Sequence, residues 1–218
     1  MTDKKKSVII ANGEFSVSER VIAVLQSAER IVCADGGANH IVSTEFTPDL
    51  IIGDMDSLLP ATKKKYDDVE IIKDTNEYTT DLMKAVDHEV SLGISRIIFL
   101  GVTGNRSDHS MASFSLLKKY ASFADISILN NFSEIDYIRN SFTFESPIGR
   151  KISLMVMSGI SSITSQGLKW EFEGDSYDFS PFGISNEVQS SPVTLDVDGD
   201  GAFLFRLFEM SNGSPLLE

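Results

Sequence analysis

The 218-residue sequence has little that can bind a soft metal, since it contains one cysteine, Cys33, and three histidines. A single cysteine excludes a disulfide within the chain and a zinc site built from several cysteines. Because Cys33 lies in an apolar run, Arg30 to Ala34, we expect a buried thiol without a chemical role. Any metal site in this chain is therefore expected to use oxygen ligands.

Basic residues are also few: 19 lysines and arginines stand against 32 aspartates and glutamates, a formal net charge of −13 at pH 7. A chain this acidic repels phosphate backbones, so we predict no nucleic-acid partner. A polyanionic substrate would need divalent cations or a few local basic groups. No apolar run approaches the roughly 18 residues that span a bilayer, and the apolar stretch near the N-terminus is too short for a signal peptide. We predict no membrane contact and a cytoplasmic location.

With 42% hydrophobic and 23% charged residues, the composition is typical of a globular protein. In the first part of the chain, short apolar runs alternate with helical patterns. The runs predicted as strands are Ser7–Ala11, Ile31–Ala34, Leu50–Ile52, Val69–Ile72, Ile97–Leu100 and Ile126–Leu129. The predicted helices follow a capping box at Ser16 and Glu19, extend from a Thr80 cap to Gly93, and cover Ser110–Tyr120. This alternation predicts an α/β fold with a parallel sheet covered by helices.

After about residue 140 the pattern changes to strands joined by Gly, Ser and Pro turns. The predicted strands are Phe142–Glu145, Ile152–Val156, Val193–Val197 and Ala202–Leu207. They indicate a small antiparallel β domain, with the boundary near 140–147. The Asp- and Gly-rich segment Asp196–Gly201 resembles the start of a calcium-binding loop, but its twelfth position is Leu207 instead of Glu. We predict a tight hairpin there.

Polar residues and glycines follow the predicted strands of the first part, at the ends where a parallel sheet binds ligands. These segments are Asn12-Gly13, Asp35-Gly36-Gly37-Ala38-Asn39, Gly53-Asp54-Met55-Asp56-Ser57, Thr80-Asp81 and Gly101-Val102-Thr103-Gly104-Asn105-Arg106-Ser107-Asp108-His109. Gly, Asn and Asp are ordinary loop residues, so each segment alone also fits a turn. Their joint placement predicts one shared site.

Several aspartates at this predicted site would repel one another unless a cation lay between them. Oxygen ligands favour a hard metal, and Mg²⁺ is the expected ion. Asp54 and Asp56 lie in a loop, so both can turn toward one ion; the alternative is that one of them only caps a turn. The glycines would let the backbone approach a nucleotide phosphate, although neither GxxxxGK[ST] nor GxGxxG is present. Arg106 is expected to face phosphate charge, with a surface salt bridge as the alternative.

Taken together and in order, these segments resemble the motifs of thiamine pyrophosphokinases. The resemblance is carried by Asp35 to Asn39, Pro48-Asp49 with Gly53 to Ser57, Thr80-Asp81, Gly104 to His109, Gly167-Leu168-Lys169-Trp170 and Ser185-Asn186-Glu187. It covers nearly the whole chain. It implies a Rossmann-like α/β domain over residues 1–140, then a small antiparallel β-sandwich domain over residues 147–218. It also implies a homodimer with thiamine near the interface.

The resemblance implies transfer of a pyrophosphoryl group from ATP to the hydroxyethyl oxygen of thiamine, giving thiamine diphosphate and AMP. The implied Mg²⁺ ligands are Asp54, Asp56 and Asp81. The implied nucleotide contacts are Asn12, Asp35, Gly36, Gly37, Gly104, Arg106 and His109. The implied thiamine contacts are Thr80, Trp170, Ser185, Asn186 and Glu187. Either Asp81 or Asp108 would accept the hydroxyl proton, and the sequence does not decide between them.

The chain departs from the family pattern in two places. Asn76-Glu77 stands where the family has an Asp-Gln pair, and Asn105 stands where it has a second glycine. Two other functions remain open at this stage. One is a sensor that binds nucleotide or thiamine without turnover, and the other is a Mg²⁺-dependent phosphohydrolase that uses the same carboxylates on water.

Overall fold

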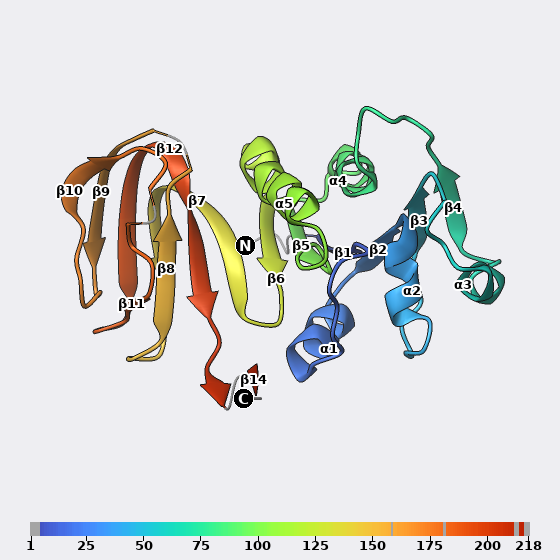
Figure 1. Cartoon of the computed structure of the whole chain (residues 1–218), viewed down its shortest axis with the longest axis horizontal. Coiled ribbons are helices and arrows are strands. Elements are labelled where there is room, and N and C mark those ends of the chain that lie inside the picture. The colour runs from blue at the N-terminus through green and yellow to red at the C-terminus, as the bar shows by residue number, and fades with distance from the viewer. Residues whose placement is uncertain (1–4, 158, 181, 212–213, 216–218) are drawn as a thin grey trace. The chain divides into compact units, whose positions relative to one another are not determined.

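The computed structural model describes residues 5–157, 159–180, 182–211 and 214–215 (Figure 1). The chain divides into two compact units, Met1–Asn131 and Phe132–Glu218. This division comes before residue 140, because the strand β7, Ser133–Phe144, belongs entirely to the second unit. The assignment of separate binding roles to residues 1–140 and 147–218 stays a prediction. The predicted fold class, a parallel α/β part followed by antiparallel strands, is confirmed.

The first unit contains six parallel strands in the order β6-β5-β1-β2-β3-β4. Their bounds are β1 Lys6–Ile10, β2 Arg30–Ala34, β3 Leu50–Gly53, β4 Glu70–Lys73, β5 Arg96–Leu100 and β6 Asp125–Leu129. The central strands are apolar on both faces and almost wholly buried, as parallel strands under helices must be. The strand order reverses between β1 and β5, and such a reversal opens a crevice at the carboxyl ends of the two strands.

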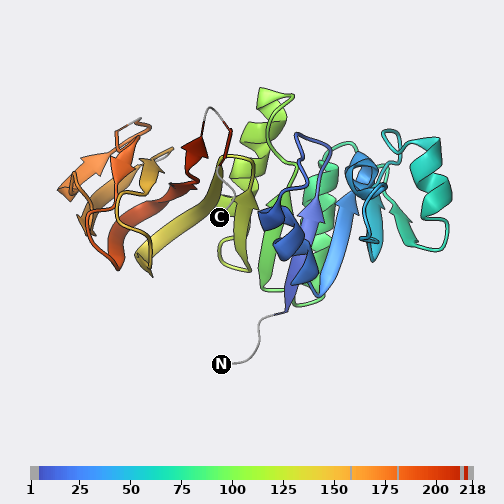
Figure 2. The ribbon, with the colours of Figure 1, turned by 90° about the horizontal axis from the view of Figure 1, so that it is seen from below.

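Helices cover both faces of this sheet, with α4 and α5 on one face and α1 and α2 on the other (Figures 1 and 2). Their bounds are α1 Glu19–Gln26, the short 3-10 helix η1 Asp35–Gly37, α2 Ala38–Ile41, α3 Pro60–Lys65, α4 Asp81–Ser91 and α5 Ser107–Tyr120. Thr80 caps α4 as predicted, since its hydroxyl accepts a hydrogen bond from the Met83 N–H at 3.2 Å.

The predicted cap of the first helix is wrong. α1 begins after Ser18, whose hydroxyl accepts a hydrogen bond from the Val21 N–H at 3.3 Å. The Ser16 hydroxyl instead donates to the side chain of Asn131. Both serines fit the local preference for a cap, and the tertiary contact with Asn131 decides which of them is used.

The second unit consists of antiparallel strands. Their bounds are β7 Ser133–Phe144, β8 Lys151–Met155, β9 Ile160–Gln166, β10 Glu173–Tyr177, β11 Asn186–Glu187, β12 Val193–Leu207, β13 Met210–Ser211 and β14 Ser214–Pro215. The long strand β12 pairs with β7, β8 and β9. Its inward side chains, among them Leu195 and Leu204, are fully buried in one apolar core with residues such as Ile163 and Val188. This core holds the unit together.

The predicted hairpin at Asp196–Gly201 is wrong, because this segment lies inside the single strand β12. Val197 pairs with Asn140 of β7, and Ala202 pairs with Ile138 of the same strand. Residues 198–201 therefore stand opposite the single residue 139 as a large bulge. Gly199 and Gly201 have φ values of 111° and 97°, which glycine adopts without strain, so the strand continues past the bulge.

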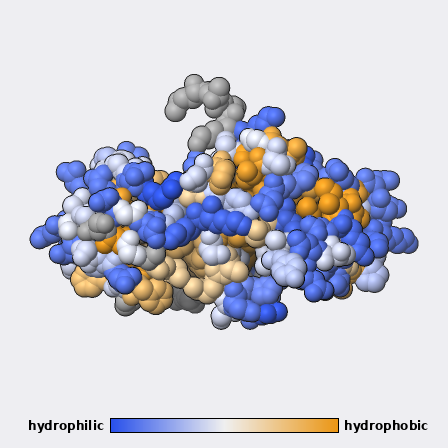
Figure 3. Space-filling view, turned by 90° about the horizontal axis from the view of Figure 1, so that it is seen from above, coloured by the Kyte–Doolittle hydropathy of each residue, from blue (hydrophilic) through white to orange (hydrophobic). Residues whose placement is uncertain are grey.

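Seen from above Figure 1, the surface is mostly hydrophilic and carries separate hydrophobic areas (Figure 3). Exposed apolar side chains of the first unit include Leu92, Met111 and Phe123. Within the described residues, none of the helices has the length and apolar character needed to cross a membrane. The cytoplasmic location stays a prediction.

Candidate functional site

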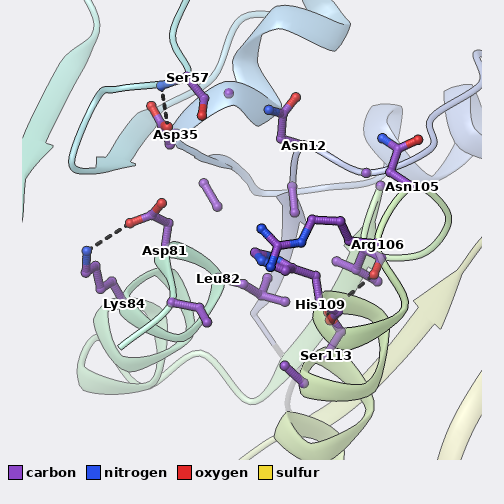
Figure 4. Close-up of a pocket in the computed structure, with 18 of the residues that line it drawn as sticks. Asn12, Asp35, Ser57, Asp81, Leu82, Lys84, Asn105, Arg106, His109 and Ser113 are labelled. Atoms are coloured by element: carbon purple, nitrogen blue, oxygen red, sulfur yellow. Dashed lines mark hydrogen bonds and ion pairs between the residues drawn. The ribbon is translucent and has the colours of Figure 1, made fainter. Parts of the chain in front are cut away.

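A pocket of about 600 Å³ lies at the carboxyl ends of the strands of the first unit (Figure 4). Four loops that follow β1, β2, β3 and β5 line it, together with the segment that leads into α4. The predicted residues that the structure brings together here are Asn12, Asp35, Gly36, Asp54, Thr80, Asp81, Gly104, Arg106 and His109. The pocket therefore lies where the strand order predicts a crevice, and the polar segments at the strand ends line it.

Three predicted residues of the first unit are not part of the pocket lining. Gly37 is buried behind it, and Asp56 and Asp108 are exposed beside it. The lining also includes Ser57, which belongs to the predicted segment Gly53 to Ser57, and residues to which the sequence assigned no role, namely Asn76, Glu77, Thr79, Lys84 and Ser113. Lys84 follows Asp81 by three residues on α4, so helical spacing alone would have placed it beside that aspartate.

The pocket contains a group of three carboxylates, those of Asp35, Asp54 and Asp81. Each contributes one oxygen, and the three oxygens lie within 4.8 Å of one another. Asp56 does not belong to this group. The chain turns at Met55, which has a φ of 69°, and the Asp56 carboxylate accepts a hydrogen bond from the Ser57 hydroxyl at 2.8 Å.

Asp35 is held in place by its backbone and by one hydrogen bond. It opens η1 directly after β2 with a φ of 42°, a conformation that costs free energy and is typical of functional sites. The Ser57 N–H donates to its Oδ2 atom at 2.9 Å. Its Oδ1 atom is buried and has no hydrogen-bond partner within the described part of the chain. A buried carboxylate oxygen without a partner is a place for a cation.

The pKa of Asp35 is raised above its ordinary value, first by burial and then by the charges of Asp81 and Asp54. The Ser57 N–H opposes this by stabilising the charged form. A carboxylate with a raised pKa in the folded state costs stability when it is ionised. This cost is absent below the pKa of the unfolded chain and is complete above the raised folded pKa.

We therefore expect Asp35→Asn to raise the melting temperature of the metal-free protein at pH 7 by about 2–4 °C. The substitution removes the charge, while the amide oxygen can still accept the bond from Ser57. The gain should shrink as the pH is lowered through the raised folded pKa and wild-type Asp35 gains a proton. Thermal denaturation between pH 4 and pH 8 measures this, and an equal gain at both ends of the range would contradict a charge effect.

Asp81 is fixed by contacts on two sides. Its Oδ1 atom accepts a hydrogen bond from the Lys84 ammonium at 2.9 Å (Figure 4). On the other side lies Gly53, where an added Cβ would be 2.9 Å from the Asp81 Cγ and 2.8 Å from the Asp35 Cβ. Only glycine at position 53 leaves room for both aspartates to approach each other.

The opposite wall of the pocket is built for an anion. The loop after β5 is tied to the loop after β1, since the Gly13 N–H donates to the Gly101 carbonyl at 2.6 Å and the Glu14 N–H donates to the Thr103 carbonyl at 2.8 Å. This places Arg106 and the N-terminus of α5 at the pocket. Backbone N–H groups at a helix N-terminus favour phosphate.

The Arg106 guanidinium makes a two-point ion pair with Asp108, at 3.1 Å from Nε and 2.5 Å from Nη2. Both side chains are exposed, so the pair is open to exchange with an incoming anion. The hydrogen bond from Arg106 lowers the pKa of Asp108 to about 2. A carboxylate with so low a pKa is a weak base at neutral pH.

In the second unit, the predicted residues Trp170, Asn186 and Glu187 lie together. The Asn186 side chain is buried, accepts a hydrogen bond from the Trp170 N–H at 3.2 Å and donates to the Trp170 carbonyl at 2.7 Å. The Trp170 ring is 56% exposed, with the Lys169 ammonium 5.0 Å from its centre. Ser185 precedes the pair with a φ of 62°. Asn186 thus fixes the backbone that presents an open aromatic ring.

Two family models match the chain in succession. The model described as "Thiamin pyrophosphokinase, catalytic domain" matches residues 21–129, which is half of the chain. The chain belongs to this family. A second model, "Thiamin pyrophosphokinase, vitamin B1 binding domain", matches residues 139–200. The resemblance inferred from the sequence is thereby confirmed, and the chain is a member of a family of kinase-type transferases.

Individual relatives agree with the family assignment. Thiamine pyrophosphokinase 1 from Oryza sativa subsp. japonica is 29% identical over 203 residues, which cover 78% of this chain and 75% of that protein. The crystal structure of thiamine pyrophosphokinase from Bacillus subtilis matches with a TM-score of 0.83 at 21% identity and covers 94% of this chain and all of that one. The yeast thiamin pyrophosphokinase structure matches with a TM-score of 0.81 at 21% identity, covering 95% and 88%. At this identity the two structures establish the fold.

Proposed function

We propose that this thiamin pyrophosphokinase family member transfers a pyrophosphoryl group from ATP to the hydroxyethyl oxygen of thiamine, giving thiamine diphosphate and AMP. The observation that carries the proposal is the convergence of Asp35, Asp54 and Asp81 opposite Arg106 in one pocket. An acidic wall for a cation and a basic wall for phosphate are what the transfer of a charged phosphoryl group requires.

In this proposal Asp35, Asp54 and Asp81 hold Mg²⁺. The fit rests on three oxygen donors within 4.8 Å of one another and on the unpartnered Oδ1 atom of Asp35. When bound, the ion would neutralise charge on the polyphosphate. Asp56 remains a candidate ligand from the sequence, and the substitutions described in the Discussion test it.

The remaining pocket residues would bind and orient the nucleotide. Arg106 would leave Asp108 and make a two-point contact with phosphate. The guanidinium fits two phosphate oxygens, and its exposed ion pair with Asp108 is weak enough to be replaced. Asn12 of the loop after β1 and His109 of α5 both line the pocket (Figure 4). Gly36 and Gly104 would offer backbone contacts. With the phosphates fixed in this way, the thiamine hydroxyl oxygen would be oriented for in-line attack on the β-phosphorus of ATP.

The proton of the thiamine hydroxyl needs an acceptor, and the geometry favours Asp81 over Asp108. Asp81 lines the pocket, whereas Asp108 is exposed beside it. A carboxylate has two oxygens with about four lone-pair sites, so Asp81 can hold Lys84 and the ion and still accept a proton. We propose Asp81 as the base.

Incubation with ATP and Mg²⁺, with and without thiamine, tests the reaction. AMP that forms only when thiamine is present, together with thiamine diphosphate, is the expected result. Phosphate or AMP release without thiamine would instead indicate the phosphohydrolase. Binding of both compounds without any product would indicate the sensor.

We also propose that the protein works as a homodimer and that thiamine lies between the first unit of one subunit and the second unit of the other. The supporting observation is the exposed ring of Trp170, held by Asn186, which offers a face to the cationic thiazolium or the pyrimidine of thiamine. Glu187 would pair with an amino-bearing ring, and Thr80 and Ser185 would add hydrogen bonds.

A mixture of two inactive variants should recover activity if the site is shared. Asp54→Asn removes the metal site of one chain and Trp170→Ala removes the thiamine platform of the other. After subunit exchange, a mixed dimer contains one intact site, so we expect about a quarter of wild-type activity from an equal mixture. That estimate assumes random pairing and independent sites. The same mixture stays inactive if each site lies within one chain, provided that exchange is shown by mass-tagged subunits.

A further inference from the structure

Lys84 is a buried cation in the wall of the pocket. It belongs to α4 and is only 7% exposed, which is rare for lysine unless the ammonium is paired. Its Nζ atom donates to Asp81 Oδ1 at 2.9 Å and to the Asp74 carbonyl at 2.8 Å. Figure 4 shows its ammonium directed at the Asp81 carboxylate. The charge of Lys84 is therefore fixed beside the carboxylate group.

The formal charges of the three aspartates and Lys84 add up to the charge that one divalent cation neutralises. Three aspartates supply −3 and Lys84 supplies +1, which leaves −2. Arg106, another basic residue of the lining, has a side chain that is 66% exposed and paired with Asp108. Solvent screens the charge of Arg106 strongly, whereas the charge of the buried Lys84 ammonium is screened much less.

Asp81 has other anchors besides its hydrogen bond with Lys84. It is the first residue of α4, which Thr80 caps, and Gly53 lies against its carboxyl carbon. The Asp74 N–H, moreover, donates to the Gly53 carbonyl at 2.8 Å, which anchors the preceding loop without the lysine. What Lys84 contributes beyond these contacts is its positive charge.

We propose that Lys84 is a positioning residue that acts as a fixed counter-charge: it weakens the binding of a free divalent cation by Asp35, Asp54 and Asp81. The cation would then be held firmly only together with phosphate oxygens, which add ligands and negative charge. The inference rests on the metal site proposed above and concerns how tightly that site holds metal before the nucleotide arrives.

The test is the binding of Mn²⁺ alone, followed by the electron paramagnetic resonance signal of the free ion, with neither substrate present. Lys84→Met should bind Mn²⁺ at least about ten-fold more tightly than wild type, because it removes a like charge near the ion from a poorly screened site. Lys84→Arg keeps the charge and should bind as wild type does. Lys64→Met, on the exposed face of α3, removes the same net charge away from the pocket and is the matched control.

Lys84→Gln serves as a second variant, since its amide can still donate a hydrogen bond but carries no charge. Circular dichroism establishes that each variant is folded. Unchanged or weaker Mn²⁺ binding by the folded Met and Gln variants would overturn the proposal, as would equal tightening in Lys64→Met. The measurement uses neither ATP nor thiamine, so a failure of the proposed reaction would leave the Mn²⁺ comparison readable.

Discussion

Asp54→Asn is expected to lower kcat by about 10³-fold, a loss typical of removing one fixed charge that stabilises a transition state. The fold should survive, because Asp54 is half-buried and its hydrogen bond with Asp56 is retained. Its Oδ1 atom accepts this bond from the Asp56 N–H at 3.1 Å, and an amide oxygen can accept it equally. The measurement is kcat at saturating ATP and thiamine over a range of Mg²⁺ concentrations, with the melting temperature as the control.

Asp56→Asn is the matched comparison, and its expected loss is at most about ten-fold. Asp56 is exposed, lies outside the three-carboxylate group and accepts a hydrogen bond from Ser57. The sequence pattern assigns Asp54 and Asp56 the same role, whereas the geometry separates them. Equal losses in the two variants would place Asp56 in the metal site and would contradict the set of Asp35, Asp54 and Asp81.

Gly37→Ala should lower the free energy of unfolding by about 3 kcal/mol, the upper end of what an added methyl group costs in a packed interior. A Cβ at Gly37 would lie 2.0 Å from the Ile10 carbonyl oxygen and 2.7 Å from its carbon. Both are backbone atoms of a central strand, so η1 must move away from β1. Because η1 carries Asp35 and Gly36, the same shift should reduce ATP turnover. Chemical denaturation and kcat measure the two effects.

Gly159→Ala is the control for this substitution. Gly159 is exposed and its backbone does not need a positive φ. Among the described residues beyond its chain neighbours, no heavy atom lies within 4 Å of an added Cβ. The stability of this variant should stay within about 0.5 kcal/mol of wild type. A Gly37→Ala variant as stable as Gly159→Ala would show that η1 does not pack against β1 as closely as described.

The strands of the first unit could be predicted from the sequence because each is a short apolar run between polar segments. All six predicted runs are strands, with bounds that differ by one or two residues. Parallel strands covered on both faces leave this signal in sequence directly. The short helices η1, α2 and α3 were missed, since helices of three to six residues are too short to show a period.

The second unit was predicted less well for a physical reason. The segment Asp196–Gly201 has the composition of a hairpin turn, and local chemistry alone favours one. The segments on both sides pair with β7, which keeps them in one bulged strand instead of two strands of a hairpin. Their partners in β7 lie about 50 to 70 residues away in the sequence. Such contacts are invisible to a local pattern.

The candidate site shows the same limit. Strand ends placed Asp35, Asp54 and Asp81 in one crevice, but the spacing of Asp54 and Asp56 could not reveal that the chain turns between them at Met55. Lys84 was missed because its proposed role depends on its burial, and lysines are usually exposed, so the sequence gives no sign that this one is buried. Helical spacing would have placed Lys84 beside Asp81, but only the three-dimensional structure shows that its ammonium is buried there.

Because β12 lies near the end of the chain, it determines which unit can fold first during translation. All six parallel strands of the first unit are complete once Leu129 has left the ribosome, so this unit can fold while the rest is still being made. The second unit has no such freedom: β7, β8 and β9 emerge early but share a partner, β12, that ends only at Leu207. During elongation these strands expose unpaired edges that a chaperone must shield or that another chain can capture. A nascent chain stalled before residue 193 should therefore be protease-resistant only in its first unit.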